Sequence, residues 1–97
     1  MTEVDSAPGG QRLDIWLYRC RLFKTRTLAT RHIKKGKIRL SRFGQIQRIN
    51  KPGFKVLPSD EISFMRGSAL FQLEIIGLPH RRGPASEARE YYSAPDS

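Results

Sequence analysis

The hydrophobic period of this sequence changes at Gly36, and that change constrains the fold more than any other feature. Before Gly36, apolar residues recur at the three- and four-residue spacing of a helix, most clearly in residues 13–20. After it, apolar and polar residues alternate, as in residues 37–40, which is typical of a strand with one buried face. The sequence therefore predicts an α+β domain in which two helices precede a small, twisted antiparallel sheet.

Two helices are expected before Gly36. The first spans about residues 12–22, and its core stripe consists of Leu13, Trp16, Leu17 and Cys20. The second begins after Thr25, whose hydroxyl suits an N-cap, and ends at Gly36, where a left-handed residue is favoured. Because only Phe23 and Lys24 are left to link them, the two helices must pack as a close pair.

Short strands separated by turn signals are expected in the second half of the chain. The first strand directs Ile38 and Leu40 to the core, and Gly44 marks the turn to a second strand around residues 45–49. Further strands are expected around residues 55–57, 62–64 and 71–75. A short helix begins near Pro84, because proline suits the first helical turn.

The second predicted helix has one face made almost entirely of cations and hydroxyls. At about 100° per residue, one arc holds Leu28, Ala29, His32 and Ile33, and the opposite arc holds Arg26, Thr27, Thr30, Arg31, Lys34 and Lys35. The chain has 18 Lys and Arg against 9 Asp and Glu, and no acid lies between Ile15 and Ser59. Because such a face repels itself, a polyanionic partner explains it better than simple solvation, and we expect nucleic acid.

Six cations are expected to contact phosphate groups: Arg26, Arg31, Lys34, Lys35, Lys37 and Arg39. Thr27 and Thr30 would donate hydrogen bonds to phosphate or to 2′-hydroxyl groups. Arg12 and Arg19 on the first helix are further candidates, although Asp14 is expected to pair with a nearby arginine.

The sequence does not support catalysis, a metal site or a cofactor. His32 and His80 are far apart and Cys20 is the only cysteine, so no metal cluster and no nucleophile–base pair is expected. Gly36-Lys37 lacks the preceding glycine of a phosphate loop. No secretory signal and no run of about 20 apolar residues is present, so we expect a cytoplasmic protein that does not act at a membrane.

The order of residues along the chain resembles the S-four RNA-binding domain, which is named after a protein of the small ribosomal subunit. The resemblance rests on Arg12-Leu13-Asp14, Leu17, Lys24-Thr25-Arg26, Ala29, Ile33, Gly36-Lys37-Ile38, Lys55-Val56 and Asp60-Glu61-Ile62. It covers about residues 11–64 and implies the alpha-L motif and binding of structured RNA. We expect a flexible leader at residues 1–10, the RNA-binding domain at 11–79 and a basic extension with a short helix at 80–97.

The residues after this domain narrow the resemblance. The run Arg81-Arg82-Gly83-Pro84-Ala85, with Glu87-Ala88 and Tyr91-Tyr92, is similar to the bacterial ribosome-associated fifteen-kilodalton heat-shock proteins. That resemblance implies a stress-response factor that binds ribosomal RNA on free large subunits still holding a nascent chain on tRNA, and that helps to recycle them. A monomer is the default expectation.

The turn after the first strand departs from the family pattern. Val-Asn-Gly is usual there, whereas this chain has Leu40-Ser41-Arg42-Phe43-Gly44, without the asparagine and with a longer loop. Arg42 and Phe43 are candidates to replace the missing contacts with a phosphate contact and a stacking ring.

Alternative functions remain open at the level of sequence. Domains of this kind also target pseudouridine synthases and tyrosyl-tRNA synthetases to RNA, although 97 residues leave no room for a catalytic domain. A general binder of structured RNA is a further alternative. Membrane binding is weaker, because Arg12, Arg19 and Arg21 form no sustained basic face, and charge does not exclude DNA.

Overall fold

The computed structural model describes residues 9–94, so nearly all of the predicted leader lies outside the described residues. A short strand, β1 (Gln11–Arg12), leads into α1 (Leu13–Arg19) and α2 (Arg26–Lys34). The next elements are β2 (Ile38–Arg42), β3 (Gln45–Ile49), β4 (Lys55–Val56), β5 (Glu61–Arg66) and β6 (Ala69–Ile75). They are followed by α3 (Ala85–Ala88), the 3₁₀ turn η2 (Arg89–Tyr91) and β7 (Tyr92–Ser93). The predicted α+β class and the short helix after Pro84 are confirmed.

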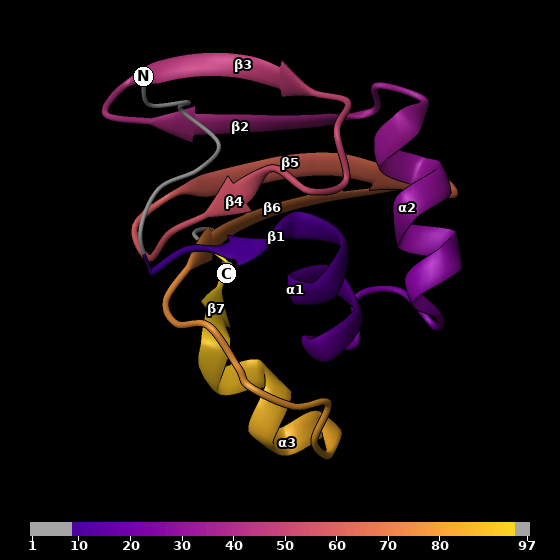
Figure 1. Cartoon of the computed structure of the whole chain (residues 1–97), viewed down its shortest axis with the longest axis vertical. Coiled ribbons are helices and arrows are strands. Elements are labelled where there is room, and N and C mark those ends of the chain that lie inside the picture. Colours follow the sequence, from indigo (N-terminus) through magenta and orange to yellow (C-terminus); the bar gives the residue numbers. More distant parts are fainter. Residues whose placement is uncertain (1–8, 95–97) are drawn as a thin grey trace.

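Five strands form one antiparallel sheet in the order β3-β2-β5-β6-β7. The predicted strand at residues 55–57 is present as β4, but it pairs with β1 outside this sheet. Figure 1 shows α1 and α2 next to each other, α2 at one end of the long strands, and α3 below α1. The turn between β2 and β3 lies at the opposite end of the sheet from α2.

One hydrophobic core joins the two helices to the sheet. The predicted stripe of α1 is buried as expected, and Trp16 is fully buried with its indole N–H donating to the Gly77 carbonyl at 2.9 Å. On the sheet, Ile38 lies opposite Phe64 and Leu40 lies opposite Ile62, all facing this core. Apolar and polar residues therefore alternate after Gly36 because one face of the strand packs against the core, as the sequence predicted.

The first helix ends earlier than predicted. It stops at Arg19, and Arg21 takes a left-handed conformation with φ of 60°. This reversal turns the chain so that Leu22 and Phe23 enter the core, where both are buried. The link between α1 and α2 therefore runs over residues 20–25, and the prediction of a two-residue link was wrong.

Both predicted ends of α2 are confirmed. The Thr25 hydroxyl accepts a hydrogen bond from the Leu28 N–H at 3.0 Å, which makes Thr25 the N-cap. Gly36 has φ of 71°, and a Cβ there would lie 3.3 Å from Cδ of Arg48. The apolar stripe is narrower than predicted, because Ala29 and Ile33 are buried whereas Leu28 is 40% exposed. Leu28 therefore lies at the rim of the core rather than inside it.

The turn between β2 and β3 is shorter than predicted. Arg42 pairs with Gln45, so only Phe43 and Gly44 remain between the strands, with φ of 53° and 78°. Positive φ at both positions suits the twist of a two-residue hairpin. The sequence predicted a longer loop because Ser41 and Arg42 do not continue the alternation of apolar and polar residues, although β2 extends through both.

The C-terminal segment packs against α1 through hydrogen bonds to backbone carbonyls. Gln11 Nε2 donates to the Pro79 carbonyl at 2.7 Å, and Arg21 Nε donates to the Gly83 carbonyl at 2.6 Å. In return, Arg82 Nε donates to the Tyr18 carbonyl at 3.0 Å, and its guanidinium lies 4.7 Å from the centre of the Tyr18 ring. These contacts hold the segment after β6 against the first helix.

Candidate nucleic-acid interface

The exposed side of α2 carries a row of cations that continues onto β2. We call this row the basic ridge; it consists of Arg26, Arg31, Lys34, Lys35, Lys37 and Arg39, all of which are exposed. Its course follows from the burial of the opposite side, because Ala29, Ile33, Ile38 and Leu40 all face the core. The structure therefore leaves all six predicted phosphate contacts exposed, on α2, on β2 and on the residues that join them.

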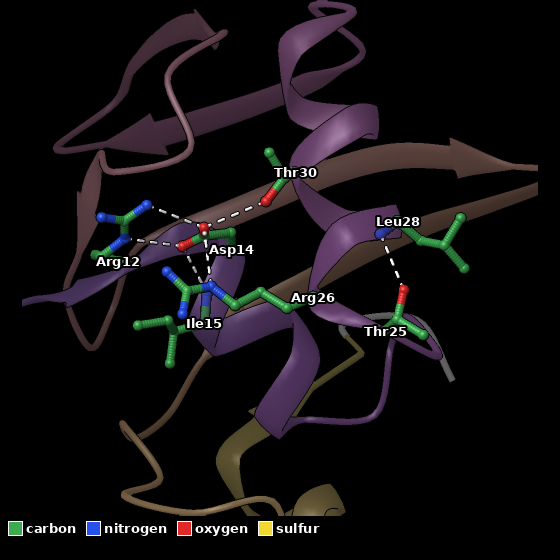
Figure 2. Close-up of polar contacts among 7 residues, drawn as sticks. All are labelled: Arg12, Asp14, Ile15, Thr25, Arg26, Leu28 and Thr30. Carbon is green, nitrogen blue, oxygen red and sulfur yellow. Dashed lines mark hydrogen bonds and ion pairs between the residues drawn. The ribbon is translucent and has the colours of Figure 1, made fainter.

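Asp14 lies beside the start of the ridge and binds several of the predicted residues (Figure 2). Its carboxylate accepts bonds from Arg12 Nε and Nη2, both at 3.1 Å, and from Arg26 Nε at 3.3 Å. The Thr30 hydroxyl donates to the same carboxylate at 3.3 Å, and the Ile15 N–H donates at 2.8 Å. The expected pairing of Asp14 with an arginine is confirmed, and it involves two arginines.

The Asp14 carboxyl is buried but remains charged. Burial by itself would raise its pKa, but the hydrogen bonds and charges of Arg12 and Arg26 outweigh that effect and hold the pKa below its ordinary value. The arginine side chains are 44% and 50% exposed, so they keep N–H donors that face solvent. Asp14 therefore fixes the two guanidinium groups in place while leaving part of each available to a ligand.

A polar hollow of about 490 Å³ lies along this flank of α2. It is lined by Arg12, Asp14, Arg26, Thr27, Thr30, Lys34, Pro52 and Gly53. Five of these residues are predicted RNA contacts; four of them lie on α2, and Arg12 comes from β1. Thr30 already donates to Asp14, so Thr27 is the hydroxyl that remains exposed for a ligand.

Arg48 is a cation of this surface that the sequence prediction did not include. It lies directly opposite Arg39 in the pairing of β2 with β3, and both side chains are exposed. Like charges at this position destabilise a strand pair, so the arrangement favours an anionic ligand across the two strands. The absence of acids between Ile15 and Ser59 was the one feature of the sequence that pointed to Arg48. Its position beside Arg39 follows only from the register of β2 and β3.

Three predicted residues lie away from the ridge. Arg42 forms an internal ion pair in which Nε and Nη2 each donate to Asp60 at 2.8 Å, and Nη2 also donates to the Lys55 carbonyl at 3.0 Å. Its side chain is only 12% exposed, so little of it is left for a phosphate, and its role as a phosphate contact stays a prediction. Arg19 donates to the Pro79 carbonyl at 3.0 Å. Phe43 is 96% exposed, at the turn farthest from α2.

Acidic side chains gather away from α2. Glu61 and Glu74 lie opposite each other across β5 and β6, and Glu61 also pairs with Ser41 close to the β2–β3 turn. Glu87 of α3 accepts a bond from Arg81 at 2.7 Å. Within residues 9–94, Asp14 is the one acid that lines the hollows beside α2 and Gly36.

The described part of the chain contains no group of three or more residues suited to hold a metal ion. Burial raises the pKa of the Cys20 thiol to about 12, which leaves it protonated and unreactive at neutral pH. No helix within residues 9–94 is long and apolar enough to span a membrane.

No protein-family model and no curated protein matches the chain. A solved structure, described as trimeric, is similar to it: heat shock protein 15 of Vibrio cholerae, which is 30% identical. The two structures superpose with a TM-score of 0.77, over 88% of this chain and 81% of the Vibrio chain. For this chain, a monomer stays a prediction. Identity and coverage of this extent, together with the shared fold, show that the chain belongs to the heat shock protein 15 family.

Proposed function

We propose that this protein binds structured RNA through the basic ridge and acts as a non-enzymatic, cytoplasmic accessory factor of the large ribosomal subunit. The observation that carries the proposal is the ridge itself, six exposed cations along α2 and β2, beside which Asp14 is the one acid among residues 9–94 that lines the neighbouring hollows. Membership of a heat-shock family supports a role under stress.

The shape of the ridge favours RNA with irregular or folded structure. Side chains cannot read the deep, narrow major groove of an RNA duplex, so proteins contact its phosphates, 2′-hydroxyls and unpaired bases. A convex helix with a polar hollow on one flank matches that requirement, because Arg12, Arg26 and Lys34 converge there on a single region. Thr27 adds an exposed hydroxyl that suits a phosphate or 2′-hydroxyl partner.

The finer role is proposed from the resemblance of the sequence. In that role, the protein binds ribosomal RNA on free large subunits that still hold a nascent chain on tRNA, and it helps to recycle them. The alternative, an RNA-targeting module of a modifying enzyme, would use the same ridge. The two are distinguished by the RNA that is bound, since a recycling factor must sediment with large subunits.

The test is co-sedimentation with purified large subunits in a sucrose gradient. Reversing two ridge charges, in the double variant Arg31→Glu and Lys34→Glu, should weaken binding by more than about tenfold, because repulsion replaces two phosphate contacts. Both side chains point to solvent, so the circular dichroism spectrum should not change.

A matched control carries the same change in net charge away from the ridge, in the double variant Arg81→Glu and Arg89→Glu. Both residues are exposed on the C-terminal segment. The control should sediment with the subunits as wild type does. Wild-type binding by the ridge variant would place the RNA site elsewhere, and equal loss in both variants would mean that only net charge matters.

A further inference from the structure

The flank of α2 opposite the polar hollow contains a second hollow of about 440 Å³, which we call the apolar hollow. It is lined by Phe23, Lys24, Leu28, Arg31, His32, Lys35 and Arg66. Its volume falls within the range of about 300–1,000 Å³ that is usual for small-molecule sites. Of the ridge residues, only Arg31 and Lys35 line it.

The floor of the apolar hollow is apolar and held rigidly. Leu28 is 40% exposed there, and the rings of Phe23, His32 and Phe64 pack in a triangle, with centroid distances of 5.1, 5.5 and 6.0 Å. Burial, with nearby Lys37 and Lys35, lowers the pKa of His32, so its ring is neutral at pH 7. The floor therefore offers flat and aliphatic surface without charge.

The rim of the apolar hollow is cationic. Lys24, Arg31 and Lys35 are exposed, and none forms an ion pair within residues 9–94. Arg66 is fixed in place, because it donates to the Leu22 carbonyl and its guanidinium lies 4.6 Å from the centre of the Phe71 ring. Among the residues that the structure describes, no acid lines this hollow.

An apolar floor inside a ring of cations matches an unpaired nucleotide. Such a nucleotide presents an uncharged, flat base between two negatively charged phosphates, whereas a paired base is stacked inside the duplex and cannot enter a hollow. Arg31 belongs both to the ridge and to this rim, so an RNA backbone that follows the ridge passes the mouth of the hollow.

We propose that the apolar hollow receives an unstacked base of the bound RNA, while Lys24, Arg31 and Lys35 hold its flanking phosphates. This inference rests on the proposed function and adds to it a preference for RNA with a bulged or flipped nucleotide. Bases that stack on aromatic side chains strengthen binding, so the preference should be measurable as a ratio of affinities.

The test compares two hairpin RNAs of identical stem and loop sequence, one fully paired and one with a single bulged adenosine. Fluorescence anisotropy at low salt should show that wild type binds the bulged hairpin at least about fivefold more tightly. Leu28→Ala should reduce this ratio towards one without weakening binding to the paired hairpin, and Leu28→Phe should keep it.

The matched control is Ile76→Ala. Ile76 is also an exposed aliphatic residue, at 48%, but it follows β6 and lines neither the apolar hollow nor the hollows beside the ridge. This variant should keep the wild-type ratio. A preference for the bulge that survives in Leu28→Ala, or that is lost equally in Ile76→Ala, would overturn the assignment of the base to this hollow.

The outcomes separate this inference from the proposed function. Equal wild-type affinity for the two hairpins, with binding still lost in the Arg31→Glu and Lys34→Glu variant, would overturn the hollow and leave RNA binding intact. Binding of neither hairpin, nor of large subunits, would overturn both. Displacement of bulged RNA by a peptide of alternating glutamate and leucine, but not by poly(A), would assign the hollow to a protein partner instead.

Discussion

The Asp14 carboxylate both stabilises the fold and holds two arginines of the candidate interface in place. Asp14 is 1% exposed, and its carboxylate accepts a hydrogen bond from the Ile15 N–H while it binds Arg12, Arg26 and Thr30. A buried charge is tolerated only when it is paired and hydrogen-bonded, and Asp14 meets both conditions. Its removal would therefore affect folding and also release two arginines that line the polar hollow.

We expect Asp14→Asn to lower the free energy of unfolding by about 1–3 kcal/mol at pH 7, because charge-assisted bonds to two guanidinium groups are lost. The folded-state pKa of Asp14 is lowered. Its contribution is therefore fully present above the unfolded value of about 3.9 and is lost as the pH falls through the folded pKa. Urea unfolding followed by Trp16 fluorescence at pH 7 and at pH 3 measures this.

The difference between wild type and Asp14→Asn should accordingly be smaller at pH 3 than at pH 7. An equal difference at both pH values would mean that the carboxylate charge does not stabilise the fold. Glu87→Gln is a suitable control, since Glu87 forms an exposed ion pair with Arg81 and should change stability by less than about 0.5 kcal/mol.

The contacts of a single residue could be predicted from the sequence only where its partner lies close to it along the chain. Asp14 is two residues from Arg12, so their pairing was foreseeable. Arg42 binds Asp60, which is 18 residues away, and only the pairing of β2 with β5 brings them together. A sequence shows that Arg42 is charged, but it does not show whether a distant carboxylate has already bound it.

Among the elements, α2 determines most of the candidate interface. It has no acid in its first turn, and Arg31 and Lys35 repel each other one turn apart, so its own charges do not favour the helix. Packing of Ala29 and Ile33 and the N-cap by Thr25 must compensate for that repulsion. The N-cap should therefore make a measurable contribution to stability.

We expect Thr25→Ala to lower the free energy of unfolding by about 1 kcal/mol, because the Leu28 N–H loses its acceptor. Thr25→Ser should retain most of the stability. Thr27→Ala is the control on the same helix, since Thr27 is exposed and does not cap, and it should change stability by less than about 0.5 kcal/mol. Urea titrations monitored by circular dichroism measure all three, and equal effects at both threonines would argue against a capping role.

The periodicity of the sequence predicted which elements form better than where they end. Both helices and strands β2, β5 and β6 were foreseeable from apolar spacing, because each buries apolar residues of one face in the core, whereas β3 buries only Ile49. The early end of α1 was not, since the burial of Leu22 and Phe23 depends on tertiary packing. For the same reason the apolar hollow was not predicted: helical spacing placed Leu28 on the apolar arc of the second helix, and the position of α2 leaves it 40% exposed.

For the molecule as a whole, RNA affinity should depend steeply on salt. If six phosphates are neutralised by the ridge, the logarithm of the association constant should fall with a slope of about −4 to −5 against the logarithm of salt concentration. Lys34→Gln should make the slope less steep by about one, whereas Arg89→Gln should leave it unchanged. Anisotropy titrations of one hairpin RNA between low and moderate salt provide the slopes, and a flat response would contradict electrostatic binding.

The separation of acids from the ridge has a consequence for how binding begins. Glu61 and Glu74 lie near the β2–β3 turn, and α2 lies at the other end of the sheet. Among the described residues, exposed cations therefore gather around α2 and Gly36, whereas Glu61 and Glu74 lie at the other end of the sheet. If the protein binds RNA as proposed, the field of this polyanion would turn α2 toward the RNA before any contact forms. A larger share of collisions is then productive, which speeds capture without adding contacts to the bound state.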